Sequence, residues 1–180
     1  LLIHNIDDIK KNQFDNLYRK IIELKNNGFV NKIGFSCYEP SQIDFLLNHF
    51  DFDLIQVPIN IFDNRLICGG QLQQLNANDI EVHARSVFLQ GILLNFENLP
   101  GYFLPWERKF FEYQELVKAS GLSLVEYALN YVLNIKEIDK VIVGVNSKEQ
   151  LGDIINAASK ELKIKVFEIE DLNLLNPTFW

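Results

Sequence analysis

Short apolar runs alternate along the chain with longer segments in which apolar residues recur every three or four positions. The short runs fall at residues 1–5, 32–36, 54–57, 80–84 and 140–143. This alternation predicts parallel strands joined by helices and disfavours an antiparallel sandwich. Most of the runs are nearly continuously apolar, which is typical of strands that are covered on both faces.

The longer segments predict helices. The first covers residues 13–27, where the apolar residues share one helical face and Gly28 supplies the end. A second helix opens at residues 40–41, with Ser41 as the expected N-cap. Further helices are expected at residues 71–75, 106–120, 124–134 and 148–160.

Two of these helices have strongly marked starts. Ser123 with Glu126, and Ser147 with Gln150, have the spacing of a capping box. An aromatic-rich insertion separates the fourth predicted strand from the helix at residues 106–120. Long loops of this kind carry substrate-facing residues in barrel enzymes.

Periodicity alone does not decide how the strands are arranged in the sheet. Right-handed crossovers between successive strands fit either an open doubly wound α/β sheet or part of a closed barrel. The 180 residues contain no internal repeat, low-complexity tract or linker, so one domain over residues 1–180 is expected.

Composition narrows the functional classes. The net charge is −7, without clustered Lys and Arg, which disfavours nucleic acid and anionic membrane surfaces as partners. No apolar run approaches the ~20 residues that a membrane-spanning helix needs. Cys37 and Cys68 have neither disulfide nor metal-ligand spacing, so no metal site is predicted and a reducing cytoplasm fits.

The start of the sequence is unusual. There is no Met, and Leu1, Leu2 and Ile3 have the character of the interior of a strand. We therefore expect the chain to be a fragment of a longer protein.

Several local strings lie at the ends of the predicted strands, in a fixed order. They are residues 1–4 (LLIH), 33–36 (IGFS), 55–60 (IQVPIN), 84–93 (ARSVFLQGIL), 142–147 (IVGVNS) and, at the end of the chain, 176–180 (NPTFW). Their order and spacing resemble strands four to eight of the aldo-keto reductases. The resemblance covers nearly the whole chain and implies part of a (β/α)8 TIM barrel, from about strand four to the C-terminus.

The resemblance also implies roles for residues near the reacting end of a nicotinamide cofactor. His4 matches the family histidine that orients the substrate carbonyl, and it is the catalytic candidate of this chain. Gln56 and Ser36 match the partners of the nicotinamide carboxamide, and both can donate and accept hydrogen bonds. The family usually has Asn after that Ser, where this chain has Cys37.

The strand-seven string implies the next part of the cofactor site. Arg85 stands where many members have an aromatic residue that stacks on the nicotinamide ring, and its guanidinium plane can stack similarly. A surface salt bridge is the alternative role for Arg85. Ser86, Phe88 and Gly91 are expected to face the pyrophosphate, since Gly91 permits close approach of the backbone.

The last string implies contacts with the adenosine end. Because an exposed helix N-terminus favours anions, the strand-to-helix segment after residue 143 is the expected site. The resemblance implies contacts from Gly144, Val145, Asn146, Ser147 and Gln150. This region departs from the family pattern, with Asp153 and Ile154 where members often have Glu and Asn, and Lys148 is the only obvious cation for a 2′-phosphate. NADPH is the expected cofactor, with NADH as the alternative.

The function implied is reduction of an aldehyde or ketone to an alcohol by an NAD(P)H-dependent oxidoreductase. The resemblance places the catalytic Tyr, Lys and Asp on strands that precede Leu1, so the isolated chain is expected to be inactive and to associate with itself through open barrel edges. A non-catalytic nucleotide-binding or regulatory protein is the alternative. An unrelated α/β hydrolase or lyase is disfavoured, because the sequence contains neither the Gly-x-Ser-x-Gly motif nor a set of metal ligands.

The remaining polar candidates are predicted to be structural. His49 and His83 are expected to stabilise a helix end and a strand. The acidic pairs Asp7 with Asp8 and Asp51 with Asp53 are interpreted as solvated turn residues.

Overall fold

A five-stranded parallel sheet forms the centre of the molecule. The computed structural model describes residues 1–11, 13–96, 99–160, 162–167, 169 and 171–180. The strands are β1 (Leu2–Ile3), β2 (Gly34–Ser36), β3 (Leu54–Pro58), β4 (Glu81–Arg85) and β5 (Lys140–Val141). They lie in the order β1-β2-β3-β4-β5, and every neighbouring pair is parallel.

This strand order decides between the two topologies that periodicity allows. A doubly wound sheet reverses its strand order at a switch point, whereas the strands of a barrel follow one another around the axis. The observed order is the order in sequence, without reversal. The sheet therefore matches part of a (β/α)8 barrel.

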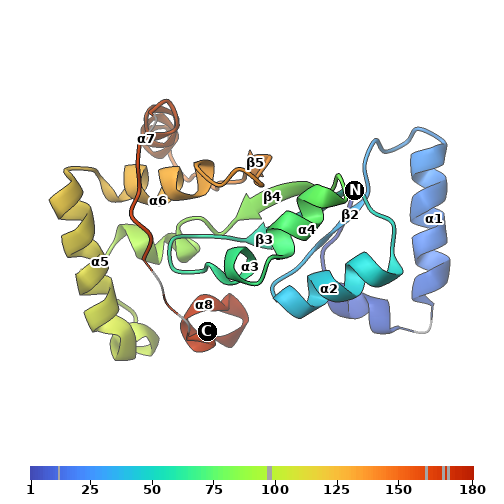
Figure 1. Cartoon of the computed structure of the whole chain (residues 1–180), viewed down its shortest axis with the longest axis horizontal. Helices are drawn as coiled ribbons and strands as arrows, with labels where there is room; N and C mark the ends of the chain where they lie inside the picture. Colours follow the sequence, from blue (N-terminus) through green and yellow to red (C-terminus); the bar gives the residue numbers. More distant parts are fainter. Residues whose placement is uncertain (12, 97–98, 161, 168, 170) are drawn as a thin grey trace.

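The helices follow the strands in the expected alternation. The helices are α1 (Phe14–Asn26), α2 (Pro40–His49), α3 (Arg65–Cys68), α4 (Gln71–Ala77), α5 (Glu107–Ser120), α6 (Leu124–Leu133), α7 (Lys148–Ala158) and α8 (Leu172–Leu175). Short 3₁₀ helices are η1 (Ile6–Lys10), η2 (Leu89–Leu94), η3 (Gly101–Trp106) and η4 (Pro177–Phe179). Figure 1 shows α1 and α2 beside β2, while α5, α6 and α7 lie at the opposite end of the molecule.

The helix starts test the predicted caps. Ser123 and Glu126 form the expected capping box at α6, with Glu126 N–H donating to Ser123 Oγ at 3.2 Å and Ser123 N–H to Glu126 Oε2 at 2.8 Å. The prediction for Ser41 is wrong. Glu39 is the N-cap of α2 and forms a capping box with Gln42, because Pro40 occupies the first helical turn, where its missing N–H costs nothing.

The two faces of the sheet differ in character. Residues that pair across parallel strands point to the same face, so Phe35, Ile55 and Val82 lie on one side. This side is fully buried against the helices. The other side carries Ser36, Gln56 and polar residues of β4, several of them half-exposed, so β4 alternates polar and apolar residues.

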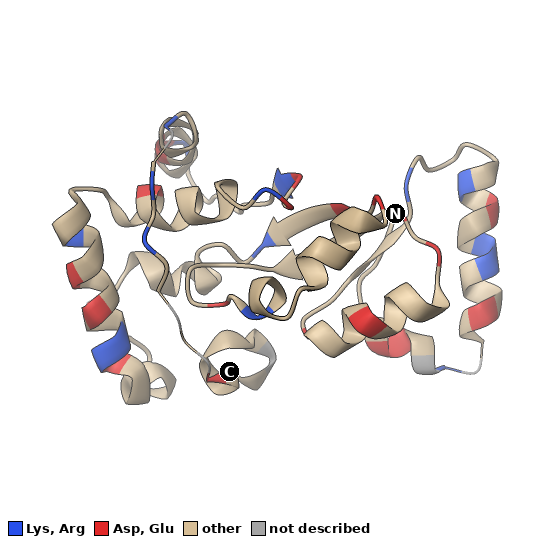
Figure 2. Cartoon of the chain, in the orientation of Figure 1, with Lys and Arg blue, Asp and Glu red and all other residues tan. Residues whose placement is uncertain are grey.

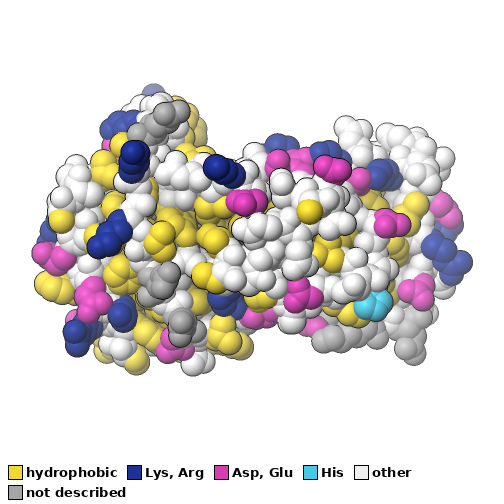
Figure 3. All heavy atoms as spheres, viewed as in Figure 1, with side chains coloured by type: hydrophobic (Ala, Val, Ile, Leu, Met, Phe, Trp, Pro, Cys, Tyr) yellow, Lys and Arg dark blue, Asp and Glu magenta, His cyan; other side chains and the backbone are white. Residues whose placement is uncertain are grey.

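Positive and negative side chains are interspersed along the outer helices α1 and α5. Figure 2 shows Lys and Arg alternating with Asp and Glu along α1 and α5. Lys20 pairs with Glu23 on α1, and Arg108 pairs with Glu112 on α5. Hydrophobic side chains reach the surface between α3 and α6 in Figure 3, where residues including Ile67 line a cavity of about 340 Å³.

Candidate functional site

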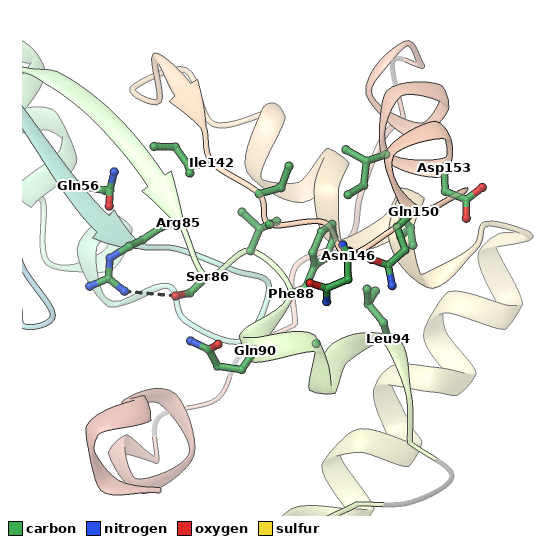
Figure 4. Close-up of a pocket in the computed structure, with 16 residues that line it drawn as sticks. Gln56, Arg85, Ser86, Phe88, Gln90, Leu94, Ile142, Asn146, Gln150 and Asp153 are labelled. Atoms are coloured by element: carbon green, nitrogen blue, oxygen red, sulfur yellow. Dashed lines mark hydrogen bonds between the residues drawn. The ribbon is translucent and has the colours of Figure 1, made fainter. Parts of the chain in front are cut away.

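A cavity of about 520 Å³ lies beside the carboxyl ends of β3, β4 and β5. The residues that follow β4 form one wall, and the N-terminal part of α7 forms another (Figure 4). Several predicted cofactor residues line it, namely Gln56, Arg85, Ser86, Phe88, Gly91, Gly144, Asn146 and Gln150. Parallel strands bring these residues together because their carboxyl ends meet at one edge of the sheet.

The wall after β4 depends on an unusual backbone. Ser86, Gln90 and Gly91 have positive φ angles of 57°, 55° and 87°. These left-handed residues turn the chain sharply, and Gly91 adopts its angle without the steric cost of a side chain. Gln90, Gly91 and Leu94 of η2 line the cavity.

Asn60 connects this bend to the loop after β3. Its Nδ2 donates to the carbonyl of Ser86 at 3.3 Å, and its Oδ1 accepts from the N–H groups of Phe62 and Asp63 at 3.0 and 3.1 Å. The side chain is fully buried, so these bonds replace those that it would make with water. The cavity is therefore shaped by two loops that are tied together.

Arg85 is the last residue of β4 and the only cation among the described residues that line the cavity. Its guanidinium lies 4.1 Å from the centre of the Tyr38 ring, and its Nη2 donates to the Cys37 carbonyl at 3.2 Å. Burial lowers the pKa of Arg85, but a guanidinium remains charged at neutral pH. Among the described residues it has no acidic partner, so the alternative of a surface salt bridge is wrong.

One hydrogen-bond donor of Arg85 has no partner among the described residues. This donor, Nε, is buried, while Nη1 donates to Ser86 Oγ at 3.3 Å. An unsatisfied buried donor of a charged group costs free energy, and it indicates a site for an acceptor.

Ser36 and Gln56 are neighbours on the same face of the sheet. They are paired in register between β2 and β3. Ser36 is buried, and its Oγ has no hydrogen-bond partner among the described residues, whereas Gln56 reaches the cavity. An orphaned hydroxyl next to a carboxamide offers the mixed donors and acceptors that an amide ligand requires.

The N-terminus of α7 is partly satisfied by its own side chains. Ser147 Oγ accepts from Gln150 N–H at 3.2 Å, as a capping box requires. Gln150 Oε1, however, accepts from Asn146 N–H at 2.8 Å, one residue before the position a capping box predicts. Val145 and Ser147 are exposed and do not line the cavity, in contrast to Asn146 and Gln150.

The other polar candidates lie outside the cavity. His4 is exposed just after β1, at the edge of the sheet opposite β5, and does not line the cavity. His49 Nδ1 bonds to the Phe45 carbonyl at 2.7 Å, and His83 Nε2 bonds to Glu81 Oε1 at 2.5 Å. The last two are structural contacts, as predicted.

Some lining residues escaped the sequence analysis. They are Val87, Gln90, Leu94, Val125, Ile142 and Val143. Asp153 and Ile154 also line the cavity, and they were noted from the sequence as departures from the family pattern near the expected adenosine contacts. Gln90 stands beside Gly91 in a string that was already identified, so its neighbourhood was a usable signal. Val125 lies on α6, far away in sequence, and nothing local could have indicated it.

The cavity has the size and the polar lining of a small-molecule site. Its volume is in the range of sites for small molecules, and polar groups from β3, β4 and α7 converge on it. None of the described lining residues is Tyr, His, Lys or Cys, side chains that often transfer protons at neutral pH.

No group of three His, Cys, Asp or Glu residues suited to a metal ion occurs in the described part of the chain. The helices described there are all too short or too polar to cross a membrane.

A nicotinamide dinucleotide fits these features. The orphaned Ser36 Oγ and the Gln56 carboxamide suit its amide, and at Gly91 of the positive-φ bend there is no side chain to keep a ligand away from the backbone. This fit concerns only the residues that the structure describes.

Comparison with known proteins agrees with this fold. Residues 1–172 match the Aldo/keto reductase family. Aldo-keto reductase AKR11C1 from Bacillus halodurans, in its holo and apo forms, has a similar structure, with a TM-score of 0.69 and 23% identity over 92% of this chain and 56% of that one. The thermostable aldo-keto reductase Tm1743, solved in complex with the inhibitor epalrestat, gives a TM-score of 0.60 and 18% identity, with 81% and 49% of the two chains covered.

The extent of these matches is informative. No curated protein matches the sequence. The chain spans about half the length of the solved structures that it resembles. The family match covers nearly all of the chain, and the strand order agrees with the barrel of these structures. The chain belongs to the aldo/keto reductase family.

Proposed function

We propose that this chain forms the cofactor-binding part of an NAD(P)H-dependent reductase of aldehydes or ketones. Family membership supports an oxidoreductase in general. The observation that carries the proposal is the cavity in which Gln56, Arg85 and Gln150 converge from three different elements. Separate elements supply these polar groups, so their convergence is a property of the fold and not of one motif.

The residues divide into three groups, one for each part of the cofactor. In the proposal, Gln56 and Ser36 hold the carboxamide of the nicotinamide, and Arg85 stacks beside its ring. Ser86, Phe88 and Gly91 approach the pyrophosphate. Contacts with adenosine come from the segment of residues 144–147 and from Gln150.

The bound reduced nicotinamide supplies the hydride, and the chain binds and orients it. His4 is the proposed partner of the substrate carbonyl, because its ring nitrogens can donate and accept. Since none of the described lining residues is a Tyr or Lys, the proton for the developing alkoxide comes from outside this cavity. The reductase activity is therefore proposed for a protein that contains a complete barrel.

Calorimetric titration of the chain with NADH and NADPH tests the proposal. We expect saturable binding of at least one nucleotide, and a loss of about tenfold or more in the Gln56→Ala variant, because a buried amide ligand loses paired hydrogen bonds. Gln74→Ala is the matched control, since Gln74 is exposed on α4 and distant from the cavity lining. Absence of binding by a sample that unfolds cooperatively would refute the proposal.

A nucleotide-binding protein without reductase activity is the second candidate. It is favoured by one observation, that the described lining offers no proton donor of the Tyr, His or Lys type. Both candidates predict nucleotide binding, but only the first predicts oxidation of NADH or NADPH when a protein with the complete barrel is given an aldehyde. That assay separates them.

A further inference from the structure

Two arginines bind the short segment that joins β2 to α2. Arg85 donates to the Cys37 carbonyl at 3.2 Å, and its guanidinium carbon lies 4.1 Å from the centre of the Tyr38 ring. Arg65, the first residue of α3, donates from Nη2 to the Tyr38 carbonyl at 3.3 Å. Tyr38 therefore contacts both arginines, one through its ring and the other through its backbone.

Arg65 is itself held by two carboxylates. Its Nε and Nη2 donate to the two carboxylate oxygens of Asp63 at 2.8 and 2.9 Å, and its Nη1 donates to Glu39 Oε2 at 2.8 Å. The side chain of Asp63 is 2% exposed and that of Arg65 is 16% exposed, so water screens this pair weakly. A bidentate pair of this kind fixes the plane of the guanidinium as well as its place.

Glu39 connects this cluster to the end of the chain. Its second oxygen, Oε1, accepts from Asn176 Nδ2 at 2.7 Å, and Asn176 is buried at the end of α8. Glu39 is also the N-cap of α2. Three segments far apart in the sequence therefore meet at Glu39, next to Tyr38 in the chain.

Arg85, by contrast, depends on neutral neighbours for its position. The described contacts of its guanidinium are the Cys37 carbonyl, the Tyr38 ring and Ser86 Oγ. Two of these three contacts come from the segment that Arg65 binds. Because a cation–π contact weakens as the cation leaves the face of the ring, a displacement of Tyr38 also displaces Arg85.

We propose that Arg65 is a positioning residue for Arg85. By binding the Tyr38 carbonyl and the Glu39 carboxylate, Arg65 fixes the segment whose carbonyl and ring hold Arg85 at the wall of the cavity. The consequence for nucleotide affinity rests on the proposed function, in which Arg85 lies beside the nicotinamide ring. The position of Arg85 is independent of it.

Nuclear magnetic resonance of the Arg85 side chain tests the positioning without a ligand. The Nε–H proton signal of Arg85, assigned by its loss in Arg85→Lys, should lie upfield of the signal of exposed Arg108, because the Tyr38 ring shields it. Arg65→Lys keeps the charge but loses the planar fork. In this variant the Arg85 signal should move toward that of Arg108. An unchanged signal in folded Arg65→Lys would overturn the proposal.

Two further variants test the same link. Tyr38→Leu removes the ring and retains the carbonyl that Arg65 binds, so the double variant with Arg65→Lys should move the Arg85 signal no further than Tyr38→Leu alone. A further shift in the double variant would refute the route through Tyr38. Glu39→Gln is a milder change of the cluster, since Arg65 keeps its pair with Asp63, and it should move the signal less than Arg65→Lys, in the same direction.

Asp53→Ala is the control for a general loosening of the fold. Asp53 binds the N–H of Ile33 at the opposite end of the strands, so its loss should destabilise the chain and leave the Arg85 signal in place. An equal shift of the signal in Asp53→Ala and Arg65→Lys would count against a specific role for Arg65.

Calorimetric titration with NADH and NADPH measures the consequence for binding. The dissociation constant should rise about threefold or more in Arg65→Lys, whereas Arg65→Lys should have no further effect in the Arg85→Ala background. If the Arg85 signal moves and the affinity does not, the positioning stands and the assigned role of Arg85 in the proposed function fails. If neither nucleotide binds to the folded chain, the proposed function fails, and the spectra still decide whether Arg65 positions Arg85.

Discussion

Arg85 shows how the surroundings of a single residue determine its role. The sequence allowed stacking or a salt bridge, because a guanidinium is suited to both. In the structure the Tyr38 ring and the Cys37 carbonyl hold the guanidinium at the end of β4. Burial raises the pKa of the Cys37 thiol to about 12, so this cysteine is a neutral packing residue beside the cation.

Glu126 has a charge that contributes to folding. It closes the capping box at Ser123 and forms an ion pair with Lys160, which follows α7. The Lys160 ammonium, followed by the hydrogen bonds at Ser123, lowers the pKa of Glu126 from 4.5 to about 2. A carboxylate whose pKa is lower in the folded state stabilises the fold at pH values above its unfolded pKa.

The lowered pKa of Glu126 predicts how the stability of the Glu126→Gln variant depends on pH. At pH 7 its thermal unfolding midpoint should lie below that of the unaltered chain, because the ionic contribution is fully present. The difference should shrink as the pH falls from about 4.5 through about 2, since Glu126 becomes protonated in both states. The difference between the two unfolding midpoints is measured by circular dichroism at several pH values. Glu115→Gln, an exposed partner of Lys118, is the control and should show a smaller difference at pH 7.

At the scale of elements, two aspartates fasten adjacent strands at their starts. Asp53, just before β3, accepts from the N–H of Ile33, just before β2, at 2.9 Å. Asp139, just before β5, accepts from the N–H of Val82 on β4 at 2.7 Å. Each bond links a strand to its neighbour where the parallel ladder begins. The interpretation of Asp53 as a solvated turn residue is therefore wrong, since it is half-buried and bonded.

Asp53→Ala should destabilise the chain by about 1–3 kcal/mol, because it leaves the Ile33 N–H without its acceptor and Lys25 without its partner. Urea unfolding gives the free energy. Asp51→Ala is the matched control, since Asp51 is exposed and its backbone carbonyl, which accepts from Tyr18, is retained. Equal losses in the two variants would argue against the fastening role.

At the scale of the whole molecule, the sheet has two free edges. Among the described residues, β1 and β5 each pair with one neighbour only. Unpaired edges can accept a further strand, and the polar face of β4 is half-exposed. Both edge strands are only two residues long, which limits the strength of such pairing.

We expect the isolated chain to associate with itself as its concentration rises. Light scattering coupled to gel filtration measures the mass at several concentrations. Leu1→Lys should weaken association, because a charge at a strand edge opposes pairing. Leu17→Lys is the control, since Leu17 is similarly exposed, at 48% against 52%, but lies on the outer side of α1. A chain that stays monomeric at all concentrations would contradict this prediction.

Local patterns predicted much of the fold. The strands at residues 54–57 and 80–84 were located to within one residue of β3 and β4, because a buried strand is a short apolar or alternating run. The start of α6 was located by Ser123, since a cap acts through neighbours in sequence. The prediction of Ser41 as an N-cap was wrong because Glu39 caps the helix and Pro40 begins its first turn.

The sequence by itself determined the alternation of strands and helices, the family and half of the residues that line the cavity. These features depend on periodicity or on short strings, which are local. The strand order, the buried partners of Arg85 and the contributions of Val125 and Asp153 to the cavity were decided only by the tertiary structure. They depend on contacts between residues far apart in the chain, and the burial that gives those contacts their strength does not exist until the sheet and helices have packed together.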